Sequence, residues 1–333
     1  MVLDLNTKKI KKNAFRITKH RGKTAIRIRV PGGELPADII PILYEVATKY
    51  GDGKLHITTR QGFEIAGIDF EDMEAVNKMI NPVIKNLLVE EGVEGVEDGK
   101  GYPAAGTRNI SSCIGNKVCP YANYNTTALA RRIEKAVFPH DHHFKIATTG
   151  CPNDCIKAHM QDFGIIGTAK VEYDYSQCVG CEACVKNCKK RVTGALEMKN
   201  GKVVRDEKRC IGCGECALTC PTQAWSRNEK KYYRMVIMGR TGKKNPRVAR
   251  TFLEWIDEET IVKVIKNTYS FVDDYIDRSL PKEHVGYIVD RMGYNIFKEY
   301  ALKDVTLPEG AKVAEYIDFG GYKYEKDAFM VNP

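Results

Sequence analysis

Cysteine carries most of the chemistry that this sequence offers. The 333 residues include 12 cysteines, and all of them lie between Cys113 and Cys220. They fall into three groups of four: Cys113, Cys119, Cys151 and Cys155; Cys178, Cys181, Cys184 and Cys188; Cys210, Cys213, Cys216 and Cys220. Residues 1–12 lack the apolar stretch of a secretory signal, so we expect a cytoplasmic protein. In that compartment, clustered cysteines are more often metal ligands than structural disulfides.

The second and third groups repeat one pattern, C-x2-C-x2-C-x3-C. This spacing is typical of bacterial ferredoxins with two [4Fe–4S] clusters, in which the fourth cysteine of each run ligates the other cluster. The predicted ligand sets are Cys178, Cys181, Cys184 and Cys220 for cluster 1, and Cys210, Cys213, Cys216 and Cys188 for cluster 2. Zinc knuckles are the alternative, because C-x2-C pairs also bind zinc. Eight cysteines at these spacings favour the iron–sulfur clusters.

The first group allows two interpretations from the residues alone. Its four cysteines either ligate a third [4Fe–4S] cluster or are buried structural thiols, since free cysteine often behaves as a small hydrophobic residue. Both pairs, C-x5-C at 113–119 and C-x3-C at 151–155, lie in turns rich in Gly, Pro and Asn. Such turns favour the cluster.

The elements that must position these cysteines alternate between strand and helix patterns, which predicts an α+β fold. The predicted strands cover 24–30, 55–59, 145–149 and 232–238, and the predicted helices cover 38–50, 71–88 (interrupted at Pro82), 126–137, 155–162 and 258–275. No segment has the roughly 18 consecutive apolar residues that a membrane span requires. The formal net charge is +9, but no basic stripe with interleaved aromatic residues indicates nucleic-acid binding.

The second cysteine pair and its neighbours resemble the signature of sirohaem-containing sulfite and nitrite reductases. The likeness lies in T-G-C-P-N-D-C at 149–155, preceded by C-x5-C at 113–119. It continues in R-I-R-V-P-G-G at 27–33, in L-H-I-T-T-R-Q at 55–61 and in the Arg-Asn pair at 108–109. The K-x-K segment of the family is matched only in part, because His143 stands where the family often has Lys.

This resemblance implies a sulfite-reductase-like sirohaem scaffold. It places a ferredoxin-like α/β domain at 1–90 and a sirohaem/[4Fe–4S] domain at 91–170 and 229–333. The second domain is then interrupted by an inserted 2[4Fe–4S] ferredoxin domain at 171–228. The predicted cofactors are therefore one sirohaem and three [4Fe–4S] clusters.

The resemblance also implies roles for single residues. The first cysteine group would ligate a [4Fe–4S] cluster, and Cys155 would bridge that cluster to the sirohaem iron as its axial ligand. The residues implied for sulfite binding and proton delivery are Arg27, Arg108, Lys145 and His143. Those implied for sirohaem contact are Thr58, Arg60, Gln61, Asn109, Asn153 and Arg240, with Lys243, Lys244 and Arg247 of the same basic loop. The simpler alternatives are an outward strand residue for Arg27, a surface histidine for His143 and a solvated charge run for 240–250.

The implied function is the catalytic subunit of a sirohaem sulfite reductase, which reduces sulfite to sulfide by six electrons that enter through the two ferredoxin-type clusters. No nucleotide-binding fingerprint is present, so the implied partners are an iron–sulfur subunit and a flavin/NADH subunit. Larger relatives contain two copies of the scaffold, so self-association is also expected. The alternatives are a sirohaem nitrite reductase and, from another class, a non-catalytic electron-transfer or sirohaem-handling protein.

Overall fold

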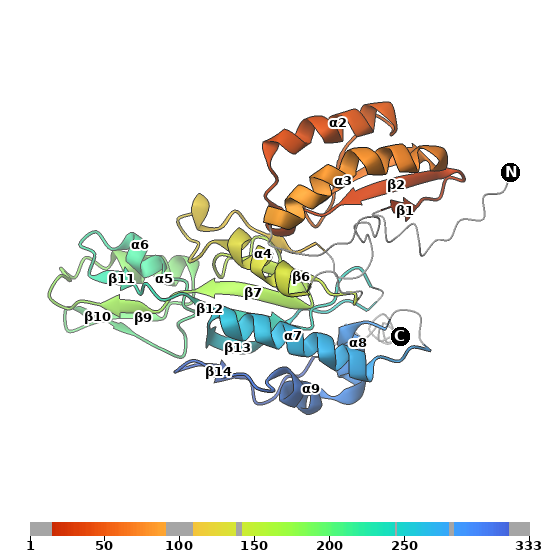
Figure 1. Cartoon of the computed structure of the whole chain (residues 1–333). Coiled ribbons are helices and arrows are strands. Elements are labelled where there is room, and N and C mark those ends of the chain that lie inside the picture. Colours follow the sequence, from red (N-terminus) through yellow and green to blue (C-terminus); the bar gives the residue numbers. More distant parts are fainter. Residues whose placement is uncertain (1–14, 91–108, 138–141, 244, 280–282, 320–333) are drawn as a thin grey trace, which may run out of the picture.

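The computed structural model describes residues 15–90, 109–137, 142–243, 245–279 and 283–319. Along the chain, these residues form an N-terminal unit, a central sheet with helices, and a small unit inserted between two strands of that sheet (Figure 1). In Figure 1 the N-terminal unit lies above one end of the central sheet, and the insert extends beyond the other end. No helix among the described residues is long and apolar enough to cross a membrane.

The N-terminal unit is a four-stranded antiparallel sheet with two helices. Its strand order is β1-β2-β4-β3. The elements are β1 (Phe15–Ile17), β2 (Lys23–Ile28), β3 (His56–Ile57), β4 (Phe63–Asp69), α2 (Ile40–Lys49) and α3 (Met73–Glu90). Alternation along β2 buries Ile26 and Ile28 and turns Arg27 away from the core. Leu43 and Val46 of α2 pack in the same core.

The predicted interruption at Pro82 is wrong, because α3 continues through that residue. Proline removes one N–H donor and crowds the preceding turn, which normally kinks or ends a helix. Here Val76 and Ile80 are fully buried against the sheet. Their burial holds the preceding turns in place and outweighs the missing hydrogen bond.

The central sheet has six strands in the order β14-β13-β12-β7-β6-β5. Its strands are β5 (Ser111–Ser112), β6 (Ile146–Thr149), β7 (Phe163–Thr168), β12 (Tyr232–Ile237), β13 (Arg250–Ile256) and β14 (Lys312–Val313). The first three run parallel, and the other pairings are antiparallel.

One face of this sheet carries the main core. The helices packed there are α4 (Thr126–Val137), α7 (Glu258–Tyr275), α8 (Val285–Met292) and α9 (Tyr294–Ala301). Ile146, Ile165 and Met235 point into this core, whereas their neighbours Ala147, Ile166 and Val236 form a separate, small cluster. Because strand side chains alternate between faces, the second cluster lies on the opposite face. Among the described residues, that face has only a thin apolar cover, which leaves it available for a cofactor.

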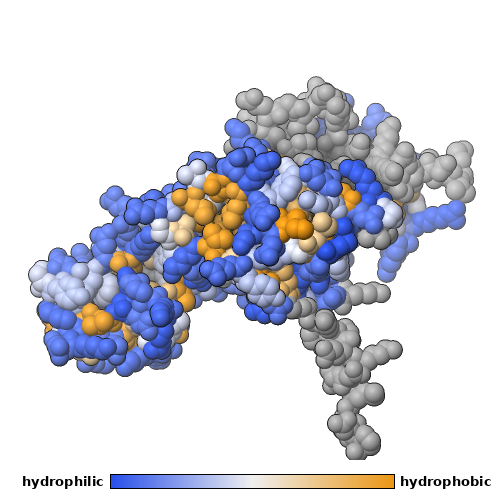
Figure 2. Space-filling view, turned by 90° about the horizontal axis from the view of Figure 1, so that it is seen from below, coloured by the Kyte–Doolittle hydropathy of each residue, from blue (hydrophilic) through white to orange (hydrophobic). Residues whose placement is uncertain are grey.

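The insert runs between β7 and β12. It contains β8 (Val171–Tyr173) paired with β11 (Trp225–Arg227), β9 (Leu196–Lys199) paired with β10 (Lys202–Arg205), and the short helices α5 (Ala183–Arg191) and α6 (Glu215–Thr219). It has its own small core around Val185, Leu196 and Trp225. Figure 2 shows it as a lobe at one end of the molecule.

Two predicted helices have the observed bounds, and one is wrong. Helices over 126–137 and 258–275 are confirmed as α4 and α7. Residues 155–162 instead form turns and a short 3-10 helix, η5 (Ala158–Met160). The Asp154 carboxylate accepts hydrogen bonds from the backbone N–H groups of Ala158 (2.6 Å) and His159 (3.1 Å). This local competition for N–H groups prevents the helix that the apolar pattern indicates.

Candidate active site and cysteine clusters

The first cysteine group lies at one edge of the central sheet. Strands β5 and β6 are parallel neighbours, so the turns that follow them leave from the same edge. Cys113 follows β5, and Cys151 follows β6 after Gly150. The Gly150 N–H donates to Cys113 Sγ at 3.1 Å, and the Cys113 N–H donates to Thr148 O at 3.1 Å. Sheet topology therefore joins two cysteine pairs that are far apart in the sequence.

The thiols of this group also lie close enough to influence one another. Burial raises the pKa of Cys151, and the charges of Cys119, Cys155 and Cys113 raise it further. Cys155 is the exposed member of the group. Three thiols in the turn walls and one that faces outward fit a cubane with a bridging ligand at Cys155.

The turn that carries Cys155 is held by Asp154. Asp154 has a left-handed φ of 49°, and its Oδ2 lies 2.6 Å from His159 Nδ1. Burial on its own would raise the Asp154 pKa, but the hydrogen bonds from His159 and the backbone outweigh it and lower that pKa. The carboxylate thus stays charged and fixes the turn. The predicted sirohaem contact Asn153 is exposed in this turn.

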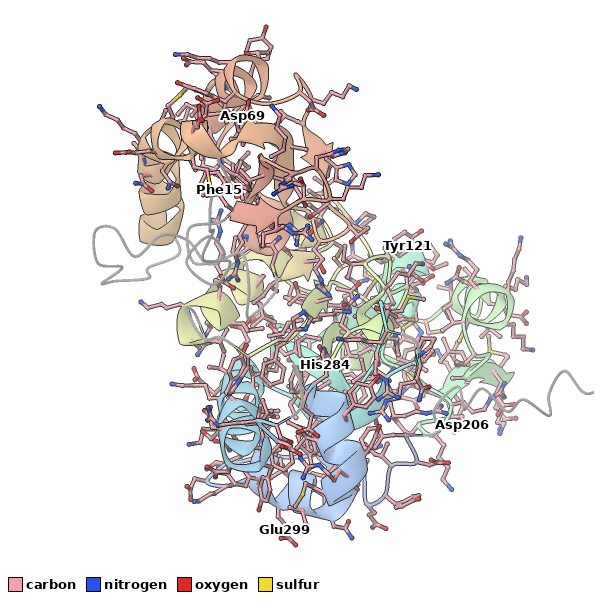
Figure 3. All side chains as sticks on the ribbon, turned by 90° about the vertical axis from the view of Figure 1, so that its right-hand side faces the viewer. Phe15, Asp69, Tyr121, Asp206, His284 and Glu299 are labelled. Atoms are coloured by element: carbon pink, nitrogen blue, oxygen red, sulfur yellow. The ribbon has the colours of Figure 1, made fainter. Side chains whose placement is uncertain are left out.

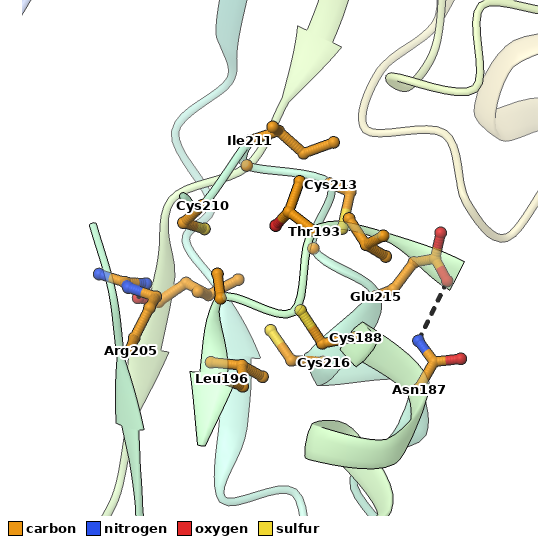
Figure 4. A pocket seen from close by; sticks show the side chains of 15 residues that line it. Asn187, Cys188, Thr193, Leu196, Arg205, Cys210, Ile211, Cys213, Glu215 and Cys216 are labelled. Atoms are coloured by element: carbon orange, nitrogen blue, oxygen red, sulfur yellow. Dashed lines mark hydrogen bonds between the residues drawn. The ribbon is translucent and has the colours of Figure 1, made fainter. Parts of the chain in front are cut away.

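Four cysteines of the insert line one pocket (Figure 4). They are Cys188, Cys210, Cys213 and Cys216. Burial, followed by the charges of Cys213 and Cys210, raises the pKa of Cys216 to about 12. Cys188 is among the charges that raise the pKa of Cys213. The fourth cysteine of the first run therefore lies beside the second run, as the ferredoxin pairing requires.

The reciprocal arrangement holds for the other set. Cys220 is among the charges that act on Cys178 and on Cys184. Hydrogen bonding by Tyr173 lowers the pKa of Cys178, whereas burial raises that of Cys184. In the part of the chain that the structure describes, no three His, Cys, Asp or Glu side chains converge on one position for a single metal ion. A cubane differs from such a site because it spreads its thiolates over four irons.

The basic residues of the candidate site lie on the amino-terminal side of β6 and β7. The Lys145 backbone N–H donates to Asp162 Oδ2 at 2.8 Å, and Lys145 Nζ donates to the carbonyl of Thr241. Asp162 Oδ1 lies 3.2 Å from His284 Nδ1, and the rings of His284 and His143 are 5.2 Å apart. His284 lies deep inside the molecule, just before α8 (Figure 3). The fold thus brings Lys145 and His143 together, beside a buried acid–imidazole pair.

This pair is strongly perturbed by its surroundings. Burial raises the pKa of Asp162 to about 7, against the opposing effect of Lys145, Arg60 and Lys243. Burial lowers the pKa of His284 to about 3, and the positive charges of His143, Lys243, Lys145 and Arg240 act in the same direction. Both side chains are therefore favoured in their neutral forms near pH 6, with one acidic proton on Asp162.

The strand motif that contains Arg27 mainly joins the N-terminal unit to the centre. Arg27 donates to Glu64 Oε2 through Nε (3.0 Å) and Nη2 (2.5 Å). Arg29 forms a buried ion pair with Glu134 of α4. A Cβ at Gly32, where φ is 77°, would lie 2.8 Å from Thr127 Cγ2. Glycine is therefore needed where this turn meets α4. The predicted substrate residue Arg108 lies outside the described residues.

The polar residues predicted to contact sirohaem also lie at this junction. Asn109 Oδ1 accepts from the Val30 N–H at 3.0 Å, and Asn109 Nδ2 donates to Arg60 O at 2.5 Å. Gln61 exchanges two 2.7 Å hydrogen bonds with the backbone of Ser112, next to Cys113. The other members make local contacts: the Arg60 guanidinium donates to Gln161, and Thr58 Oγ1 accepts from the Gly62 N–H.

The basic loop after β12 is largely occupied by an acid that the sequence did not single out. Arg240 and Arg247 are both buried, and they lie 3.1 Å and 2.5 Å from the two carboxylate oxygens of Asp290. Asp290, Asp162 and His284 were all missed in the sequence analysis. They are single residues without a motif, and only the tertiary fold brings them to this loop. Lys243 acts on the Asp162–His284 pair, and Lys244 lies outside the described residues.

Comparison with known proteins identifies the class. Residues 104–308 match the family model described as the nitrite and sulphite reductase 4Fe-4S domain, and residues 17–83 match that of the nitrite/sulfite reductase ferredoxin-like half domain. The chain belongs to the sirohaem-dependent nitrite and sulfite reductase family, which confirms the resemblance. It is an oxidoreductase that acts on a sulfur group, with iron–sulfur and sirohaem chemistry.

Individual relatives narrow this class further. The chain is 44% identical to a subunit of the anaerobic sulfite reductase of Salmonella typhimurium, over 95% of both chains. It is 29% identical to the coenzyme F420-dependent sulfite reductase of Methanocaldococcus jannaschii, over 84% of this chain and 42% of that protein. The fold is similar to that of dissimilatory sulfite reductase I, with a TM-score of 0.64, 17% identity, and coverage of 90% of this chain and 74% of that one.

Proposed function

We propose that this chain is the catalytic subunit of a sirohaem sulfite reductase, which reduces sulfite to sulfide by six electrons. The observation that carries the proposal is the grouping of the thiols: one set of four at the edge of the central sheet, and two sets with exchanged fourth members in the insert. The relative named as part of an anaerobic sulfite reductase supports sulfite as the substrate.

In this proposal the three sets hold three [4Fe–4S] clusters, and residues 171–228 form an inserted ferredoxin domain. Domains at 1–90 and at 91–170 with 229–333 make up the rest of the scaffold. When bound, sirohaem supplies an iron that takes up sulfite and receives electrons from the cluster through the Cys155 thiolate. The exposed position of Cys155 and the thin cover on the adjacent sheet face support this placement.

The chain's own contribution is positive charge and protons. Sulfite is an anion whose oxygens leave as water, so the site must neutralise charge and deliver protons. Lys145 and His143 are placed to do this beside Asp162 and His284. With a pKa raised to about 7, Asp162 holds a proton close to neutral pH and can replace one given up by its neighbours.

Arg27 supplies a fixed positive charge in this proposal, with Arg108 as its companion from the adjoining segment. Arg27 shares Glu64 with Arg16, whose Nη1 lies 2.8 Å from Glu64 Oε1. Two guanidinium groups on one carboxylate leave an excess positive charge. Arginine binds oxyanions well because its fork of N–H donors matches their geometry.

Electrons reach the site through the insert from other proteins. A relative named as one subunit of a sulfite reductase supports donor subunits for this chain as well, and we propose an iron–sulfur subunit with a flavin/NADH subunit. Pairing of two copies of the scaffold, each completing the site of the other, belongs to the same proposal.

Steady-state rates test the substrate. With a reduced viologen dye as donor, we expect kcat/KM for sulfite to exceed that for nitrite, with sulfide as the product. The family model covers both substrates, so a sirohaem nitrite reductase is the second candidate. Efficient nitrite reduction with negligible sulfite turnover would establish it. A protein that carries sirohaem but reduces neither anion would instead be an electron-transfer or sirohaem-handling protein.

A further inference from the structure

Arg227 joins two cysteine loops that belong to different units. It is the last residue of β11, where the insert returns to the central sheet. Its Nε donates to Gly214 O at 3.2 Å, directly after Cys213, and its Nη1 donates to Pro120 O at 3.2 Å, directly after Cys119. One guanidinium group therefore ties the loop of cluster 2 to the loop of the sirohaem-linked cluster.

The charges around Arg227 come from both cysteine groups. Burial lowers its pKa, and the thiol charges of Cys213, Cys216 and Cys151 oppose that effect. Its Nη2 is buried and has no hydrogen-bond partner among the described residues. A buried cation with an unused donor, set among thiols of two groups, is suited to stabilise negative charge on either side.

The packing of the cluster 2 loop fixes this arrangement. A Cβ at Gly214 would lie 2.7 Å from Arg227 Nε, and a Cβ at Gly212 would lie 2.6 Å from Trp255. The Gly212 carbonyl also accepts from the Ala169 N–H at 2.8 Å. Both glycines have positive φ, 72° and 68°. The loop is therefore held against the central unit by contacts that only glycine permits.

We propose that Arg227 is the electrostatic junction through which cluster 2 and the sirohaem-linked cluster exchange electrons. This inference rests on the proposed function. In each transfer, cluster 2 is oxidised by one electron and the sirohaem-linked cluster is reduced by one, with no bond broken. An external low-potential protein donor re-reduces the insert through cluster 1, whose Cys181 is exposed.

The direction of the effect follows from the charge of the guanidinium group. A reduced cluster is more negative than an oxidised one, so a nearby positive charge stabilises the reduced form and raises the reduction potential. Cys213 and Cys216 stand before Cys151 among the charges that act on Arg227. Loss of the charge should therefore lower the potential of cluster 2 most.

The test is a redox titration of the holoprotein followed by electron paramagnetic resonance. For Arg227→Gln we expect about a tenfold loss in the equilibrium constant for reducing cluster 2, which is about 59 mV for one electron. Arg227→Lys keeps the charge and should change it less than threefold. The matched control is Arg191→Gln, because Arg191 of α5 is a cation at the same junction that contacts Tyr121 (Nη1 to Oη, 3.4 Å). It should leave the potential unchanged.

Rapid reduction gives a second readout. In Arg227→Gln, reduction of the sirohaem-linked cluster should slow about tenfold, while cluster 1 is reduced at the parental rate. Unchanged potentials and rates in a fully loaded Arg227→Gln protein would overturn this inference alone. Loss of cluster loading in both the Gln and the Lys variant would overturn it in favour of a purely structural role. A parental protein without sirohaem or iron would instead overturn the proposed function.

Discussion

The central unit and the insert hold their cysteines in different ways. In the centre, cysteine-bearing turns leave a six-stranded sheet whose large core contains no cysteine among its described members. In the insert, Cys184 is part of the small buried core, and four other cysteines pack against it. The comparison teaches that the central scaffold supports its cluster, whereas the insert depends on its clusters for its own stability.

Iron removal should produce the largest difference between the two regions. Small domains whose ligands form much of the core obtain their folding energy from the metal. After chelation, we expect the amides of 171–227 to lose hydrogen-exchange protection, while β6, β7 and β12 remain protected. Mass spectrometry of exchanged peptides measures both regions in one sample. Loss of protection in both regions together would break the distinction.

Core truncations sharpen the same comparison in the iron-free protein. Phe252 is fully buried between Tyr294 and Phe297, so Phe252→Ala should lower the free energy of unfolding by about 3–5 kcal/mol. Leu196→Ala in the insert should leave that transition unchanged, because the insert is already unfolded without iron. Denaturant titration of the two variants measures this. Equal destabilisation by both would show that the insert folds on its own.

Serine substitutions compare the two regions in catalysis. Cys155→Ser should lose the haem–cluster coupling and lower dye-driven activity by about 100-fold or more, because the bridging thiolate is removed. Cys213→Ser should mainly slow electron entry and lower that activity only about tenfold. Each figure is an activation free-energy change of about 1.4 kcal/mol per factor of ten. Equal losses for both variants would contradict separate roles for the bridge and the wire.

The smallest effect concerns pH and lies wholly in the central unit. The Asp162 pKa is raised to about 7 in the folded state, so the folded protein binds more protons than the unfolded one between about pH 4 and 7. Stability from this group is full below pH 4 and is lost as pH rises through 7. Asp162→Asn should therefore gain on the order of 2 kcal/mol relative to the parent between pH 5 and 8.

Thermal or denaturant unfolding at both pH values measures that gain. His284 is present in both proteins, so its own titration cancels in the difference. A comparison with Asp290→Asn provides a control, since Asp290 is a partly exposed acid paired with Arg240 and Arg247. Parallel pH profiles for the parent and Asp162→Asn would refute the perturbed pKa.

The sequence predicted what depends on period and spacing. Helices α4 and α7 have strong apolar periods, and their bounds agree with prediction. The exchanged fourth cysteines, Cys188 and Cys220, follow from the ferredoxin spacing. The failures at Pro82 and at 155–162 arose where tertiary burial or a side-chain hydrogen bond overrode the local pattern.

Other parts of the site could not be predicted from the sequence. Asp162 and His284 are separated by more than a hundred residues and meet only because the start of β7 lies beside the start of α8. Arg227 contacts carbonyl groups on two loops from different units. Neither arrangement leaves a spacing pattern, because each depends on how complete elements pack.

An absorption spectrum combined with iron and sulfide analysis tests the central claim most directly. Protein purified without oxygen should show sirohaem bands and contain one sirohaem and about twelve cluster irons per chain, as three [4Fe–4S] clusters require. Cys213→Ser should lose iron but keep its sirohaem bands. About four irons in the parent protein, or zinc in place of iron in the insert, would contradict the assignment of the two ferredoxin-type clusters.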